Sequence, residues 1–270
     1  MVRDKPERTQ ATLKELADMA AAGSVPAIAG SLRGKLQFAK GQAFGGSGAF
    51  GLHGLGALER GPPRPPGPFL DGLLEFWVGY FRDLVPRTVL LRDLRPPVVV
   101  AVDGAVEGDG VGLATFGAVL FDPAAGGPAQ VIAEEVAEAP AAEWRAEGSK
   151  NVIMQAELLP AAVAACTWRE SVRGRMVFLL VDNESARFAL IKGYSAAQHS
   201  ARLVGEFWKA AGAAECPTWV LRVPSSSNPA DGPSRGRWPW VGGRWARCDA
   251  VPPADLRARW GEVSRPLPIF

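Results

Sequence analysis

Two aspartates end two strongly apolar stretches of this sequence. Asp103 follows the run in "PVVVAVDG", and Asp182 follows the run in "RMVFLLVDN". Continuous apolar runs of this length are typical of strands that are buried on both faces. Since neighbouring strands that end in aspartate present their carboxylates at one sheet edge, the sequence predicts that Asp103 and Asp182 lie close together.

Two further acidic residues are placed where they could join this pair. Glu157 lies within "QAELLPAAVAACTW", whose apolar flanks fit a solvent-facing glutamate poorly. Asp231 stands between a proline and a glycine-proline in "SSSNPADGPSR", with no carboxylate neighbour in sequence. Any acidic partner of Asp231 therefore comes from elsewhere in the fold.

Taken one at a time, these residues have ordinary structural explanations. An aspartate after a strand commonly forms a turn or caps a helix, which fits Asp182 followed by Asn183. A single glutamate on a helix commonly faces solvent. Only the four residues together favour a functional site.

The elements that must position these residues follow from the apolar periodicity of residues 96–236. Strands are predicted within residues 97–104, 111–123, 129–140, 175–183 and 217–227, and helices within 151–172, 184–194, 195–214 and 228–236. This order gives an antiparallel meander followed by parallel strands that are connected through helices. The fold class is therefore α/β, with a five-stranded mixed sheet flanked by helices.

The first 95 residues have a helical period instead. Helices are predicted within residues 7–23, 24–45 and 69–85. A glycine-rich patch at residues 45–56 leads into the stiff linker "GPPRPPGP". We therefore divide the chain into a helical segment (1–95), an α/β domain (96–236) and a C-terminal tail (237–270).

Composition limits the class of protein. Of 270 residues, 47% are hydrophobic and 21% are charged, which is typical of a globular protein. No apolar run approaches the ~20 residues that cross a bilayer, and the charged start lacks the apolar region of a secretory signal. We therefore expect an intracellular protein that is neither secreted nor bound to a membrane. The three cysteines are far apart, which indicates free thiols and no zinc or disulfide framework.

Charge is distributed unevenly along the chain. The formal charges of residues 1–95, 96–236 and 237–270 are +4, −5 and +3. An acidic middle between basic ends fits a metal-dependent nuclease whose flanks bind nucleic acid, but ordinary fluctuation would produce the same pattern.

Four segments together resemble the ribonuclease H domain of retroelement reverse transcriptases. They are "VVVAVDGA", "QAELLPAAVAACTW", "VFLLVDNESA" and "VPSSSNPADGPSR", in the order and approximate spacing of that family. The last is similar to the "N-x-x-AD-x-x-SR" ending of such domains. The resemblance covers roughly residues 96–235, about half of the chain, and implies a ribonuclease H-like fold.

A weaker resemblance concerns the helical segment. The stretch "LRGKLQFAKGQAFG" looks like the thumb or connection segment that follows the fingers and palm in DIRS-like or related retroelement polymerases. No polymerase "YxDD" motif occurs in the chain. The chain therefore looks like the C-terminal part of such a polyprotein, with a polymerase domain as a candidate upstream partner.

Carried over to this sequence, the resemblance makes Asp103, Glu157, Asp182 and Asp231 the catalytic and metal-binding carboxylates. It implies two Mg²⁺ or Mn²⁺ ions, with Asp103 bridging both, Glu157 and Asp182 completing one site and Asp231 completing the other. Two ions about 3.5–4 Å apart can activate a water and stabilise the leaving oxygen of a phosphodiester. Oxygen ligands suit these metals, and nearby histidine or cysteine ligands for zinc are missing from the sequence. The implied activity is endonucleolytic hydrolysis of RNA in an RNA–DNA hybrid.

Some positions depart from the family pattern. Many cellular ribonucleases H have a histidine in the loop before the last helix, where this chain has "PSSSN", and His199 is expected at the surface. Pro160 requires the helix of Glu157 to begin near Ala156 or later, since proline inside a helix kinks it. Two alternatives therefore stay open. One is a catalytically inactive module from a decayed retroelement, and the other is an integrase-like enzyme, against which the fourth carboxylate counts.

Other residues carry weaker predictions. Asn228 or Ser227 is expected to cap the short helix that aims Asp231 at the sheet, and Gly104 is expected to permit close approach of a strand or nucleotide. Asn183 and Ser185 are candidates for contacts with the substrate backbone, or for helix capping. The tail alternates Trp238, Trp240 and Trp245 with Arg237, Arg244 and Arg247. These tryptophans either stack on unpaired bases or, as we favour, fold back onto the domain.

Overall fold

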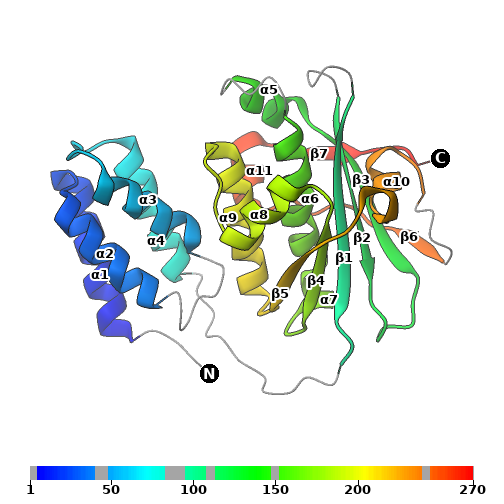
Figure 1. The fold of residues 1–270 in the computed structure, drawn as a ribbon, viewed down its shortest axis with the longest axis horizontal. Helices are drawn as coiled ribbons and strands as arrows, with labels where there is room; N and C mark the ends of the chain where they lie inside the picture. Colours follow the sequence, from blue (N-terminus) through cyan, green and yellow to red (C-terminus); the bar gives the residue numbers. More distant parts are fainter. Residues whose placement is uncertain are drawn as a thin grey trace. The chain divides into compact units, whose positions relative to one another are not determined.

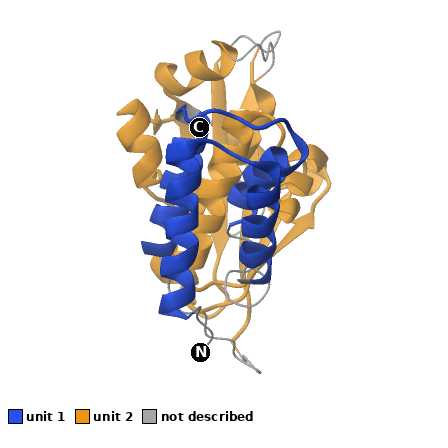
Figure 2. Ribbon diagram, turned by 90° about the vertical axis from the view of Figure 1, so that its left-hand side faces the viewer, with its two compact units in different colours: residues 1–91 blue, residues 92–270 orange. Residues whose placement is uncertain are grey.

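The computed structural model describes residues 5–39, 48–82, 95–107, 113–146, 152–238 and 244–269. It divides the chain into two compact units, residues 1–91 and 92–270, which have different colours in Figure 2. In the ranges that are described, no helix combines the length and apolar character needed to cross a membrane.

The first unit is helical, in agreement with its sequence period. Its described helices are α1 (Pro6–Ala22), α2 (Pro26–Ala39), α3 (Ala49–Arg60) and α4 (Pro68–Arg82). They share a core of leucines around the fully buried Trp77. The sequence analysis does not predict α3, because glycines there indicate a turn-rich patch. A Cβ atom on Gly51 would lie 2.6 Å from the Trp77 ring, so this glycine lets α3 pack directly against α4.

The second unit contains one mixed sheet (Figure 1). Its strands are β1 (Val98–Val106), β2 (Ala114–Phe121), β3 (Ala129–Val136), β4 (Val177–Val181), β5 (Thr218–Arg222), β6 (Trp245–Arg247) and β7 (Ser264–Pro266). The strand order is β5-β4-β1-β2-β3-β6, and β7 also pairs with β3. Strands β1, β2 and β3 form the antiparallel meander, and β4 and β5 are parallel to β1.

The predicted mixed α/β sheet flanked by helices is confirmed. The five predicted strands are β1 to β5, and the last part of the chain adds β6 and β7, which bring the sheet to seven strands. Helices of this unit are α5 (Glu138–Ala146), α6 (Ile153–Thr167), α7 (Arg169–Val172), α8 (Glu184–Lys192), α9 (Gln198–Ala213), α10 (Asp231–Ser234) and α11 (Ala254–Trp260). Of these, α5 and α11 are not predicted by the sequence analysis.

The two faces of the sheet are covered by different elements. Val98, Val100 and Val102 of β1 belong to the main core, which also contains α6 and α9. Ala101 of β1 belongs to a smaller core on the other face, together with Ala230, the residue that precedes α10. Because side chains alternate along β1, each functional side chain of this strand projects from a defined face of the sheet.

Residues predicted to form a separate tail pack on the sheet. Trp245 of β6 contacts Phe121 of β2, with ring centroids 5.6 Å apart, so this part of the tail folds back onto the domain. Leu256 and Val263 are buried in the main core. Trp238 is 42% exposed, and Trp240 lies outside the described residues.

Candidate metal centre

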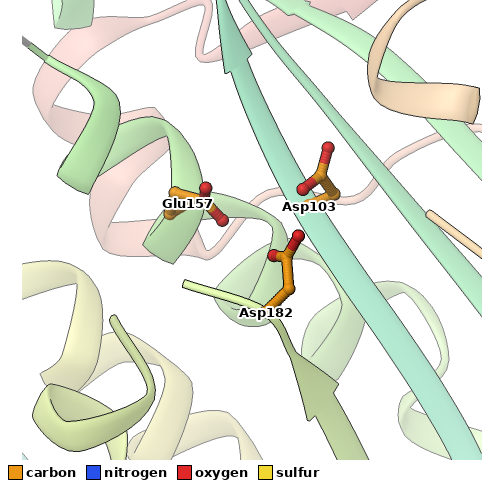
Figure 3. A group of neighbouring side chains, drawn as sticks. All are labelled: Asp103, Glu157 and Asp182. Atoms are coloured by element: carbon orange, nitrogen blue, oxygen red, sulfur yellow. The ribbon is translucent and has the colours of Figure 1, made fainter. Parts of the chain in front are cut away.

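Asp103, Glu157 and Asp182 come together at one end of the sheet. One carboxylate oxygen from each lies within 4.8 Å of the other two. Figure 3 shows that they come from a strand, a helix and the residue that follows a second strand. Asp103 and Glu157 are buried, and Asp182 is half-buried. The structure therefore brings together three of the four carboxylates that the sequence analysis singled out.

The end of β4 explains why carboxylates from both faces can meet. Val181, the last residue of β4, pairs with Val102 of β1, so β1 continues beyond its parallel neighbour from Asp103 onward. Asp182 follows immediately after β4 and lies beside Asp103. Glu157, on α6, reaches the same position from the main-core face.

Gly104 sets the distance between β1 and α6. A Cβ atom at this position would lie 2.4 Å from the backbone carbonyl carbon of Ala156, closer than any side chain could approach. The backbone of Gly104 also acts to lower the pKa of the Glu157 carboxyl, against the larger effect of burial. The sequence analysis expected a strand or nucleotide to approach Gly104, whereas the structure places the backbone of a helix there.

Pro160 lies inside α6, so the condition that the helix begins near Ala156 or later is not met. The helix begins at Ile153, so Glu157 and Pro160 both lie beyond its first turn. Because proline has no N–H, it cannot donate to the carbonyl of Ala156, four residues earlier. That same peptide group packs against Gly104. The helix is therefore irregular at the point where it meets β1 beside Glu157.

Burial and the charges of neighbouring carboxylates raise the pKa values of Asp103 and Glu157. Burial is the main cause that raises the pKa of Asp103 to about 7, and the charges of Asp182 and Asp231 act in the same direction. Burial likewise raises the pKa of Glu157 to about 8, assisted by the charges of Asp103 and Asp182. Hydrogen bonds from Ser234 to Asp103 and from Asn183 to Glu157 oppose these shifts. Without a bound cation, these two carboxyls therefore favour their neutral forms.

The donor set fits a divalent cation. Oε2 of Glu157 and Oδ1 of Asp182 are buried, and in the described part of the chain neither has a hydrogen-bond partner. Buried oxygens without donors are costly unless a ligand satisfies them. All three ligand atoms are carboxylate oxygens, which Mg²⁺ and Mn²⁺ prefer.

Asp231 lies outside this group of three. It begins the short helix α10, and its charge is close enough to raise the pKa of Asp103. Its carboxylate accepts a hydrogen bond from Nε of Arg235 at 2.9 Å, and its second oxygen lies 3.5 Å from Nη2 of Arg237. The role of Asp231 as a metal ligand stays a prediction.

Three polar side chains hold α10 on the sheet, and the sequence analysis assigned no role to two of them, Ser234 and Thr115. The hydroxyl of Ser234 contacts the Asp103 carboxylate and the backbone carbonyl of Asp231. The Thr115 hydroxyl on β2 donates to the carbonyl of Ser234 at 2.6 Å. The Asn228 amide donates to the carbonyl of Val102 at 3.0 Å. The Ser-Arg that closes "NPADGPSR" was the available sequence signal for Ser234.

The expected capping of α10 differs in detail. The helix follows Ala230, and no side chain caps its first turn. Asn228 instead accepts a hydrogen bond from the backbone N–H of Ala230 and ties the loop to β1. Asn183 does cap α8, since its side chain accepts from the N–H of Ala186. Asn228 therefore positions Asp231 by anchoring the loop rather than by capping.

His199 is buried, which corrects the expectation of a surface residue. Its side chain is 4% exposed, and Nδ1 lies 3.5 Å from a carboxylate oxygen of Glu143 on α5. The histidine is not among the residues that form the carboxylate group. His199 lies in the first turn of α9, which packs against α6.

This chain is similar to several solved structures at low sequence identity. No family model and no curated protein matches the chain. One solved structure is the N-terminal RNase H domain of Rv2228c from Mycobacterium tuberculosis, as a fusion with maltose binding protein. It is 16% identical to this chain, with a TM-score of 0.39. The match covers 52% of this chain and 91% of that one. RNase H1 from the halophilic archaeon Halobacterium salinarum NRC-1 is 18% identical, with a TM-score of 0.35, over 49% of this chain and 89% of that one. At these scores neither likeness assigns an activity to this chain.

Proposed function

We propose that this chain is a divalent-metal-dependent endonuclease that hydrolyses the RNA strand of RNA–DNA hybrids. Its context would be the C-terminal part of a retroelement reverse transcriptase, with a polymerase domain upstream. The observation that carries the proposal is the convergence of Asp103, Glu157 and Asp182 within 4.8 Å at the end of the sheet. The sequence resemblance supplies the substrate class and the fourth carboxylate, Asp231.

The residues of the site fit the demands of phosphodiester hydrolysis. Two bound Mg²⁺ or Mn²⁺ ions would activate a water and stabilise the leaving oxygen. Asp103, Glu157 and Asp182 would hold these ions, together with Asp231. Ser234 orients the Asp103 carboxylate, and the Asn183 amide, which donates to Oε1 at 3.4 Å, orients that of Glu157. Both ligands are thereby fixed before a cation or substrate arrives, which lowers the cost of assembling the site.

A cleavage assay tests this proposal. The full chain is incubated with end-labelled RNA–DNA hybrid, duplex DNA and duplex RNA of one sequence, with Mg²⁺, Mn²⁺ or EDTA. We expect metal-dependent cuts in the RNA strand of the hybrid only. Asp103→Asn, Glu157→Gln and Asp182→Asn should each lower the rate by more than about 100-fold, since loss of supporting residues at metal sites alone costs 10–100-fold.

Glu184→Gln is the matched control. Glu184 lies two residues after Asp182, but it is exposed and pairs with Arg187 outside the carboxylate group. This variant should cut as the parent does. Binding of hybrid without cleavage would overturn the nuclease in favour of a binding module, and equal cleavage of duplex DNA would overturn the substrate class.

A further inference from the structure

Arg235 and Arg237 form ion pairs with Asp231, the fourth of the carboxylates that the sequence analysis singled out. We propose that the two arginines hold Asp231 in the metal-free chain and transfer to phosphates of the bound nucleic-acid strand, which releases Asp231 to a cation. This exchange of arginine partners, from Asp231 to phosphate, rests on the proposed function, since it requires a phosphate backbone beside the carboxylates. It assigns Arg235 and Arg237 as positioning residues that couple strand binding to cation binding.

Both oxygens of Asp231 are engaged by these arginines. Nε of Arg235 donates to Oδ1 at 2.9 Å, and Nη2 of Arg237 lies 3.5 Å from Oδ2. A cation that binds either oxygen must compete with a guanidinium. The chain therefore carries its own positive charge at the position where a metal would be needed.

The backbone of Asp231 is anchored, so the exchange involves side chains alone. Asn228 bonds to the carbonyl of Val102, and Thr115 bonds to the carbonyl of Ser234. Gly117 of β2 leaves no space between the sheet and α10, because a Cβ there would lie 2.4 Å from the N atom of Ser234. With the helix fixed on β1 and β2, what can change is the partner of the Asp231 carboxylate.

The arginines are free to take a different partner. The side chains of Arg235 and Arg237 are 52% and 62% exposed, whereas that of Asp231 is 32% exposed. An ion pair that faces water is weak, so its loss costs little. Guanidinium groups bind phosphate through paired hydrogen bonds, and this geometry makes a nucleic-acid backbone a strong competitor for them.

Arg235 lies within electrostatic reach of the carboxylate group. Its charge lowers the pKa of Asp103, and the charges of Asp231, Asp103 and Asp182 raise the pKa of Arg235. A strand whose phosphate lies beside Asp103 is therefore within the electrostatic reach of Arg235. Because binding linkage is reciprocal, the strand should strengthen cation binding, and the cation should strengthen strand binding.

Two titrations that need no cleavage test the exchange. In the first, Mn²⁺ is titrated into the full chain without nucleic acid, by calorimetry. Arg235→Gln should bind Mn²⁺ about two- to fivefold more tightly than the parent, the range expected from removing one exposed ion pair. The double variant with Asp231→Asn should lose this gain, because the released carboxylate is then absent.

In the second titration, binding of an RNA–DNA hybrid is measured in EDTA at several salt concentrations. Arg235→Gln and Arg237→Gln should each weaken binding and reduce the slope of log K against log salt by about 1, as expected for one lost phosphate contact. Arg173→Gln is the matched control, since Arg173 pairs with Glu170 in an exposed pair far from α10 in sequence. Thermal melting verifies that each variant is folded.

The results separate this inference from the proposed function. If Arg235→Gln changes neither Mn²⁺ affinity nor the salt slope while Asp103→Asn abolishes cleavage, the exchange is wrong and the nuclease stands. If both titrations shift as expected but no hybrid is cut, the exchange holds in a chain that binds without cutting. An equal effect of Arg173→Gln would also overturn the exchange.

Discussion

Asp103 lies directly opposite Gly117 in the antiparallel pairing of β1 and β2. The missing side chain of Gly117 is what lets α10 rest on the sheet, because a Cβ there would meet the Ser234 N atom at 2.4 Å and the Ala230 carbonyl oxygen at 2.8 Å. Ser234 in turn contacts the Asp103 carboxylate. One glycine thus allows the helix that carries Asp231 to pack against the strands beside Asp103.

Gly117→Ala should displace α10. The added methyl group has no space, so we expect the free energy of unfolding to fall by about 1–3 kcal/mol, as for other overpacked sites. Loss of the Ser234 contact should also weaken Mn²⁺ binding. Urea unfolding and calorimetry measure the two effects.

The control for this variant is Gly205→Ala. Gly205 lies within α9, and a Cβ there meets nothing within 4 Å. Alanine should stabilise this helix by about 0.5–1 kcal/mol. If both variants changed stability alike, close packing at Gly117 would not be the cause.

Glu157→Gln should stabilise the metal-free chain at alkaline pH. The pKa of Glu157 is raised from 4.5 to about 8, chiefly by burial. Between these values the folded chain binds more protons than the unfolded chain, so the free energy of unfolding of the parent falls as pH rises through this window. Glutamine removes this part of the slope. The gain at pH 8.5 should be on the order of 4–5 kcal/mol, since one pKa unit corresponds to about 1.4 kcal/mol.

This prediction is checked by denaturant unfolding in EDTA from pH 4.5 to 8.5. The gain should vanish near pH 4.5, where Glu157 is protonated in the folded chain and the penalty is absent. A gain of the same size at every pH would mean that glutamine improves packing and that the charge of Glu157 has no role.

Divalent cations should stabilise the parent chain and not Asp103→Asn. A ligand that binds only the folded state at 100 times its dissociation constant raises the free energy of unfolding by about 2.7 kcal/mol. Because cations and protons compete for the same carboxylates, the rise in melting temperature should be larger at pH 8 than at pH 6. EDTA should reverse it. An equal rise in Asp103→Asn would place the bound cation elsewhere.

Leu256→Ala tests whether the C-terminal residues belong to the core. Leu256 of α11 is fully buried in the main core of the second unit. Its truncation should cost about 2–5 kcal/mol, as for other buried leucines. Leu221→Ala on β5, where the leucine is 38% exposed, should cost much less. Similar losses in the two variants would contradict the observed packing of α11.

The sequence by itself was sufficient for the strands that carry the aspartates. Apolar runs that end at Asp103 and Asp182 predict buried strands from local composition, and the helix of Glu157 follows from its apolar flanks. These features depend on burial and periodicity within one segment, which a single sequence records. The sequence does not predict helix α3, because glycines such as Gly51 weaken the helical pattern. A glycine is needed at position 51 because the helix packs closely against Trp77 there.

Only the tertiary structure decided which carboxylates converge and what holds them. The register of β1 with β4 and β2 places Asp103 beside Asp182 and opposite Gly117. The docking of β6 and β7 on β3 depends on where β3 lies in space. Strand order and register join residues that are far apart along the chain. Local sequence pattern therefore does not encode them, and the free energy of packing the whole domain selects them.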